Sequence, residues 1–130
     1  MATRNPFGHI DLRVSSMERA AAFYDALLPE LGFTVTHHGG GWRVHATDAP
    51  FPDTAYMAVT EDPGHRPSAT RIAFLVEDPG EVDRVAEVAR GAGARNVTGP
   101  KPMPYGPDYR AAFFEDPCGN RFEVYFRRAG

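Results

Sequence analysis

The chain has 130 residues, of which 42 % are hydrophobic and 12 % aromatic, and it carries a formal net charge of −3. This hydrophobic content is sufficient for a folded interior and excludes a mainly disordered chain. No stripe of lysine and arginine stands out, so nucleic acid is not expected as a partner.

The sequence also disfavours membrane insertion and disulfide bonding. No stretch approaches the ~18 consecutive apolar residues of a membrane span, and the first residues contain no apolar signal-peptide region. The single cysteine, Cys118, cannot form a disulfide within the chain. We therefore expect a cytoplasmic protein with no membrane partner.

The first half of the chain begins with a strand and a helix. Apolar and polar residues alternate over 8–15, which predicts a half-buried strand. Ser15 or Ser16 offers an N-cap for a helix whose apolar residues recur at helical spacing, with Pro29 and Gly32 near its end. Three short strands are predicted next, at 33–37, 42–46 and 54–59.

The pattern restarts after a linker at 61–68 that contains proline and glycine. A strand at 71–76 precedes a helix, with Asp78 suited to its N-cap and Pro79 to its first position. A long loop is predicted at 99–108, because its prolines and glycines interrupt regular structure. The remaining strands are predicted at 94–97, 109–115 and 121–127.

The two halves repeat each other. Residues 8–14 align with residues 70–76 with their apolar positions in register, and the helices that follow also coincide. Each half is therefore predicted to run strand, helix and three-stranded meander, at 7–60 and 69–127 of a single domain, 1–130. Two such βαβββ modules cannot bury their sheets alone. We therefore predict an α+β fold in which they share one curved mixed sheet around a concave cavity.

Three segments of this repeat resemble one known family. The opening segment reads HIDLRVSSMERAAAFYDALLPELGF, the middle one RIAFLVED and the closing one AAFFEDPCGNRFEVYF. They are similar to the landmarks of the vicinal-oxygen-chelate superfamily, which includes glyoxalases, bleomycin-resistance proteins and extradiol dioxygenases, and together they cover nearly the whole chain. The resemblance implies this fold and a homodimer. It does not single out one reaction, because the chemistries of the fold are diverse.

In that family a divalent metal, where present, is held on the floor of the cavity. The resemblance places the first ligand at His9 and the last at Glu123, with Tyr56 near the position of a glutamate in glyoxalase-type members. The histidine position of the second module is Arg71 here. Arginine stays protonated and has only donors, so it cannot bind a metal ion. We therefore expect no cofactor, the alternative being a Zn, Ni, Mn or Fe ion bound by His9 and Glu123.

Arg71 suggests that the family's metal position binds a ligand directly in this chain. Its guanidinium can stand where the ion would, pair with Glu123 and His9, and orient an anionic or carbonyl-bearing ligand through forked hydrogen bonds. The alternative is that Arg71 and Glu123 form a structural ion pair with no chemical role.

Aromatic and histidine side chains outside the family's metal positions are further candidates. Tyr105 and Tyr109 flank the long loop, which either closes over the cavity as a lid or packs on its rim. Trp42 either lines the cavity or belongs to the core. The other histidines are expected at the surface or in hydrogen bonds rather than as ligands: His37, His38, His45 and His65.

Two kinds of function follow as alternatives. The first is binding of a small organic ligand without a metal, by His9, Trp42, Tyr56, Arg71, Tyr105 and Tyr109. The second is catalysis, either by a metal-dependent lyase, isomerase or dioxygenase or by a metal-free enzyme with Glu123 as general base.

Overall fold

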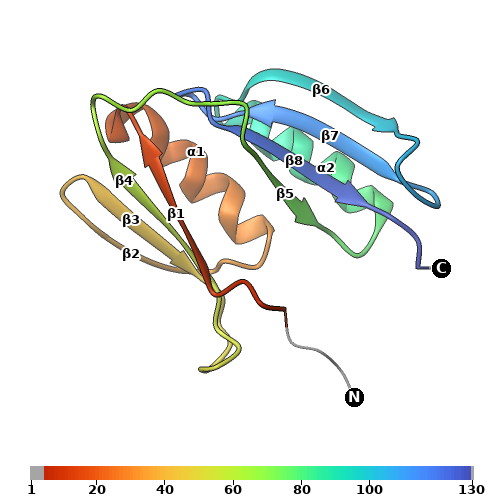
Figure 1. Ribbon diagram of the computed structural model, residues 1–130, viewed down its shortest axis with the longest axis horizontal. Coiled ribbons are helices and arrows are strands. Elements are labelled where there is room, and N and C mark those ends of the chain that lie inside the picture. Colours follow the sequence, from red (N-terminus) through yellow and green to blue (C-terminus); the bar gives the residue numbers. More distant parts are fainter. Residues whose placement is uncertain (1–4, 130) are drawn as a thin grey trace.

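The computed structural model describes residues 5–129 as two halves with the same order of elements (Figure 1). The first half contains β1 (His9–Val14), α1 (Met17–Glu30), β2 (Val35–Gly39), β3 (Trp42–Ala46) and β4 (Tyr56–Glu61). The second half contains β5 (Arg71–Leu75), α2 (Pro79–Gly91), β6 (Arg95–Pro102), β7 (Arg110–Glu115) and β8 (Arg121–Phe126). The predicted α+β fold built from two βαβββ units is confirmed.

Each half forms its own four-stranded mixed sheet. The strand orders are β1-β4-β3-β2 and β5-β8-β7-β6. The first and last strands of each half pair in parallel, and the last three strands form the predicted antiparallel meander. Strands β1 and β5 each lie at the edge of their sheet that faces the other half, and within the described part of the chain they are not paired with each other (Figure 1). The sequence predicted one shared sheet, whereas the two halves meet through side chains.

Both helices begin where the sequence predicted. The Ser16 hydroxyl accepts a hydrogen bond from the backbone N–H of Arg19 at 3.3 Å, and the Asp78 carboxylate accepts one from that of Gly80 at 2.7 Å. Such caps satisfy backbone donors that have no partner in the first turn. Neither helix is long and apolar enough to cross a membrane, within residues 5–129.

The sixth strand is longer than predicted. The sequence predicts a strand only at 94–97 and a loop at 99–108, but β6 continues to Pro102 through two shifts of register against β7. These irregularities accommodate prolines, which cannot donate to a regular ladder. Gly99 has φ +84°, and a Cβ there would lie 2.7 Å from the Ala111 carbonyl oxygen. Glycine therefore permits the close approach of β6 to β7.

One core joins the two halves. Phe23 of α1 lies 6.2 Å from Phe114 and 6.4 Å from Phe122, between ring centroids, although both partners belong to the second sheet. Phe33, which follows α1, lies 6.4 Å from Phe74 of β5. The first helix therefore packs on the second half as well as on its own sheet.

Each sheet has a helix-covered face and an open face. Strand residues of the helix-covered face belong to the common core, among them Leu12, Met57, Phe74 and Val124. The alternation of side chains places the residues between them on the other face. The open face therefore carries the four family positions, His9, Tyr56, Arg71 and Glu123.

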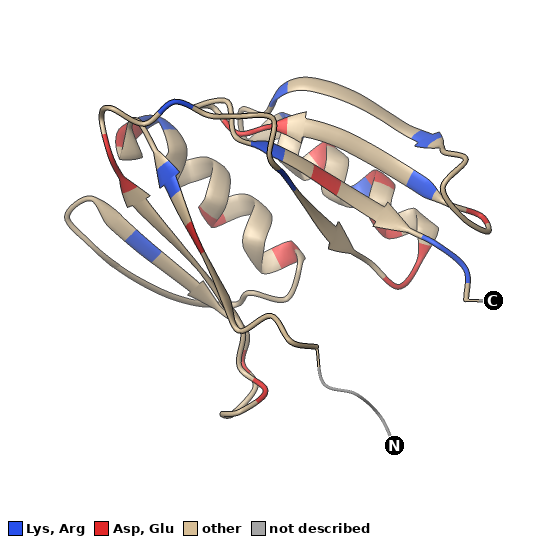
Figure 2. Ribbon diagram, in the orientation of Figure 1, with Lys and Arg blue, Asp and Glu red and all other residues tan. Residues whose placement is uncertain are grey.

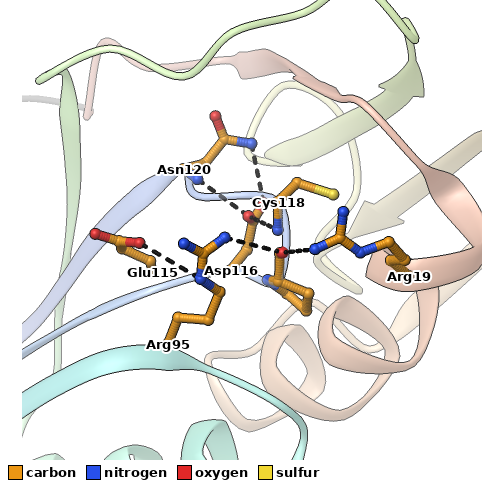
Figure 3. A network of polar contacts seen from close by, with 7 residues as sticks. Arg19, Arg95, Glu115, Asp116, Cys118 and Asn120 are labelled. Atoms are coloured by element: carbon orange, nitrogen blue, oxygen red, sulfur yellow. Dashed lines mark hydrogen bonds and ion pairs between the residues drawn. The ribbon is translucent and has the colours of Figure 1, made fainter.

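The turn between β7 and β8 contains a buried carboxylate that is fully used within the protein (Figure 3). Asp116 has no exposed surface. It accepts hydrogen bonds from the backbone N–H of Cys118 at 2.7 Å, and from the backbone N–H and side-chain amide of Asn120 at 3.0 and 2.9 Å. It also accepts one from the Tyr24 hydroxyl of α1. Burial, together with the Asp116 charge, raises the pKa of Tyr24, so this hydroxyl stays a donor.

The same turn makes further bonds to the first half. The Asn120 amide donates to the Arg13 carbonyl oxygen of β1 at 2.8 Å. The Pro117 carbonyl oxygen accepts from Arg19 of α1 at 2.9 Å and from Arg95 of β6 at 3.4 Å (Figure 3). The turn therefore links the two halves as well as closing a hairpin.

We expect Asp116→Ala to lower the free energy of unfolding by about 3 kcal/mol or more, because several buried donors lose their acceptor. The matched control is Asp83→Ala, which removes an exposed carboxylate bonded to Arg110 at 2.9 and 3.1 Å. That change should cost less than about 1 kcal/mol, as exposed ion pairs usually do. Urea denaturation of both variants measures the difference, and equal losses would contradict the role given to Asp116.

Candidate functional site

A cavity of about 660 Å³ lies between the inner strands β1 and β5. Its volume falls within the range of about 300–1,000 Å³ that is usual for small-molecule sites. Most of its wall is apolar and comes from both halves: Phe7, Ile10, Phe33, Met57, Ile72, Phe74 and Leu75. The cavity can therefore receive an organic molecule along the seam between the sheets.

Three of the predicted site residues line this cavity, namely His9, Tyr56 and Arg71. The other four do not line it: Trp42, Tyr105, Tyr109 and Glu123. The predicted residues thus divide between the cavity and the neighbouring surface of the second sheet.

His9 and Tyr56 form one side of the cavity. They are paired in register on β1 and β4, and their rings are stacked, with centroids 4.5 Å apart and planes 3° from parallel. Nε2 of His9 lies 3.6 Å from the Asp11 carboxylate, and about half of the His9 side chain is exposed. The pair offers a flat aromatic surface with polar edges, which suits a planar or carbonyl-bearing ligand.

Arg71 lies on the opposite wall at the start of β5. Its guanidinium carbon stands 5.0 Å from the ring centroid of Phe113, a cation–π contact. The suggested ion pair with Glu123 is not formed: within residues 5–129, Arg71 has no carboxylate within 4.0 Å. The reason lies in the register, since Arg71 is paired with Arg121, while Glu123 is paired with Ala73.

Glu123 is the buried acid of the open face. Its residue is only 8 % exposed, and its carboxylate accepts a hydrogen bond from the Tyr109 hydroxyl at 2.5 Å. Burial and this hydrogen bond raise the pKa of Tyr109, which therefore keeps its proton at neutral pH. A carboxylate can accept about four hydrogen bonds. Glu123 uses one within the described chain, so it retains acceptor capacity for a ligand.

Three tyrosines form a stack beside Glu123. The Tyr109 and Tyr125 rings are parallel within 5°, with centroids 4.9 Å apart, and Tyr105 meets Tyr109 edge-on at 5.3 Å. Tyr105 remains 59 % exposed. Tyr125 also lines the cavity, so it connects the tyrosine stack to the cavity wall. Sequence reasoning missed Tyr125, although it lies two residues after Glu123 and so shares its face.

Trp42 and His45 lie outside the cavity. Trp42 is 42 % exposed at the β2–β3 hairpin, where its indole covers Gly39. His45 is fully buried and shares a hydrogen bond with the Thr36 hydroxyl at 3.2 Å. Burial lowers the pKa of His45 and outweighs the opposite effect of the Asp25 carboxylate, which lies 3.6 Å from Nε2, while Arg43 adds a smaller lowering. This histidine is therefore a neutral core residue, and its hydrogen bond agrees with the sequence-based expectation.

The family positions of this chain do not fit a divalent metal. Such a site usually needs three protein ligands besides water or substrate. No group of three His, Cys, Asp or Glu side chains lies close enough to bind an ion in the part of the chain that the structure describes. Arg71 adds a fixed positive charge at the family's histidine position.

The chain also matches a known protein family at the level of sequence. The Glyoxalase/Bleomycin resistance protein/Dioxygenase superfamily model matches residues 7–124. The chain belongs to this superfamily. Members commonly use divalent metals, whereas this chain has an arginine at position 71. No curated protein sequence matches the chain significantly.

Solved structures share the fold at low sequence identity. A glyoxalase/bleomycin resistance protein from Albidiferax ferrireducens T118 superimposes with a TM-score of 0.73 at 21 % identity, covering 95 % of this chain and 100 % of that one. A glyoxalase-related enzyme from Fulvimarina pelagi gives 0.72 at 20 %, covering 95 % and 88 %. The fosfomycin resistance protein FosX from Mesorhizobium loti gives 0.66 at 19 %, covering 97 % and 95 %. At these identities the likeness shows the fold alone.

Proposed function

We propose that this superfamily member binds a small organic molecule in the cavity between β1 and β5 and orients it with its own side chains rather than with a metal. The observation that carries the proposal is the cavity of about 660 Å³, whose walls are mainly apolar and whose polar groups include His9, Tyr56 and Arg71. Such a site gains most of its affinity from apolar burial and its specificity from a few polar contacts.

Filling the cavity tests this proposal. Ala73 lines the cavity from β5, so Ala73→Trp should weaken binding of neutral aromatic fragments by roughly ten-fold or more through steric exclusion. Ala22→Trp is the matched control, because Ala22 is exposed on α1 and does not line the cavity. Ligand-observed NMR measures binding, and circular dichroism checks that both variants fold. Unchanged binding in Ala73→Trp, or no binding to the parent protein, would contradict the proposal.

A metal-independent enzyme is the second candidate. It is favoured by the pair formed by the buried Glu123 and the partly buried Tyr109, in which a carboxylate and a protonated hydroxyl are 2.5 Å apart on the open face. The carboxylate can take a proton from a ligand, while the hydroxyl can donate one to a developing oxyanion. A metal-dependent lyase, isomerase or dioxygenase would need ligands that the described chain does not bring together.

Glu123→Gln separates catalysis from binding. It keeps the shape of the side chain but removes the base, so any turnover measured for the purified protein should fall by about 100-fold or more. Glu87→Gln, at an exposed site on α2, should leave the rate unchanged. Rates are measured with and without EDTA. A rate that survives Glu123→Gln would remove the proposed base, and a rate abolished by EDTA would favour the metal-dependent alternative.

We propose further that the chain acts as a homodimer. Phe7 and Leu75 border the cavity but are 72 % and 62 % exposed, which is unusual for large apolar side chains at a functional seam. The inner strands β1 and β5 also have one unpaired edge each within the described residues. A second copy could cover both features.

Light scattering measures the mass in solution. We expect about twice the 14.3 kDa of one chain, and we expect Leu75→Lys to shift the protein toward monomer because a charge would be buried at the contact. Phe51→Lys is the control, since Phe51 is 91 % exposed and does not border the cavity. A parent protein with the mass of a single chain would refute the dimer.

A further inference from the structure

One row of the second sheet is rich in arginine. Four open-face residues lie side by side across its strands: Arg71 of β5, Arg121 of β8, Glu115 of β7 and Arg95 of β6. Figure 2 shows the basic starts of β5 and β8 next to each other at this end of the sheet. We call these four residues the arginine row.

The charges of the arginine row are not balanced within the chain. The one carboxylate, that of Glu115, lies 3.9 Å from the guanidinium of Arg95. Arg71 and Arg121 have no carboxylate within 4.0 Å, counting residues 5–129. Because like charges on neighbouring strands repel each other, this pair costs stability unless an anion lies between them.

A small pocket lies at these two arginines. It has a volume of about 170 Å³, and its polar lining residues are Arg71, Arg121, Asn96, Thr98 and Glu115. The Glu115 carboxylate is paired with Arg95, so the two remaining guanidinium groups leave the pocket with a net positive charge. The Asn96 amide and the Thr98 hydroxyl make no hydrogen bond with any other described residue, so both can donate to a bound group. The contact with Phe113 holds the Arg71 guanidinium in place at the pocket.

The size of the pocket indicates what it can hold. At about 170 Å³ it is smaller than the about 300–1,000 Å³ usual for a whole organic ligand. It suits one charged group rather than a complete molecule. Two guanidinium forks beside neutral donors match the planar or tetrahedral arrangement of oxygens in a carboxylate or a phosphate.

We propose that Arg71 and Arg121 bind an oxyanion, the acidic group of the ligand whose body occupies the cavity. This inference rests on the proposed function in one respect, since Arg71 lines both the pocket and the cavity. The ligand is then an organic acid or an organic phosphate. Arg121, which does not line the cavity, is assigned to the acidic group alone.

Titration with simple anions tests the assignment. Inorganic phosphate and acetate are added at constant ionic strength, and binding is followed by the backbone amide NMR signals of the β5 and β8 residues. We expect saturable binding of at least one anion, weakened roughly ten-fold or more in Arg121→Gln through loss of a charge-assisted hydrogen bond. Arg90→Gln removes the same charge from α2, where Arg90 is exposed near Glu87, and should leave binding unchanged.

Each outcome decides the proposal. Phosphate binding without acetate binding indicates an organic phosphate, and the reverse indicates a carboxylic acid. No saturable binding of either anion, or equal weakening by Arg121→Gln and Arg90→Gln, overturns the oxyanion site. A neutral aromatic fragment is titrated in the same samples. If it binds the parent protein and Arg121→Gln equally while the anions fail, the cavity proposal stands and only the oxyanion site is lost.

Discussion

The buried carboxylate of Asp116 is the constraint on which the arrangement of the two halves depends. A buried charge is tolerated only when donors replace the water it loses, and Asp116 has donors from its own turn and from α1. Asn120 extends this network to the end of β1. The turn belongs to the second half, whereas Tyr24 and Arg13 belong to the first, so these hydrogen bonds hold the two halves together at one end of the sheets.

Two buried carboxylates in one hairpin serve different ends. Asp116 lies in the turn and is saturated by the protein, whereas Glu123 lies in the middle of β8 and accepts only from Tyr109 in the described chain. A saturated carboxylate stabilises a fold but has little capacity for a ligand. Glu123, Arg71 and Arg121 instead share the open face of one sheet with acceptors and donors to spare. Along β8, the alternation of side chains places Phe122 and Val124 in the core and Arg121 and Glu123 on the open face.

The sequence predicted the fold well where one physical signal dominated. Period-two alternation located β1, a strongly apolar run located β5, and the caps at Ser16 and Asp78 located both helices, because these signals are local. The predicted end of β6 was wrong, because shifts of register allow prolines within this strand. The predicted single sheet was also wrong, because local sequence does not show whether the edge strands β1 and β5 pair with each other.

The site was harder to predict. The resemblance pointed to His9, Tyr56 and Arg71, which line the cavity, but the relation of Arg71 to Glu123 depends on the register between β5 and β8, which local sequence does not determine. For the same reason, the sequence alone did not show that Arg121 is the neighbour of Arg71 in the arginine row, because this depends on how the strands pair.

The single thiol of the chain lies in the Asp116 turn, which makes it a probe of the contact between the two halves. Cys118 is 8 % exposed, and its sulfur lies 3.6 Å from the Ser16 carbonyl oxygen at the start of α1. The rate at which a thiol reagent labels Cys118 therefore measures how often the turn and the start of α1 move apart in the folded protein.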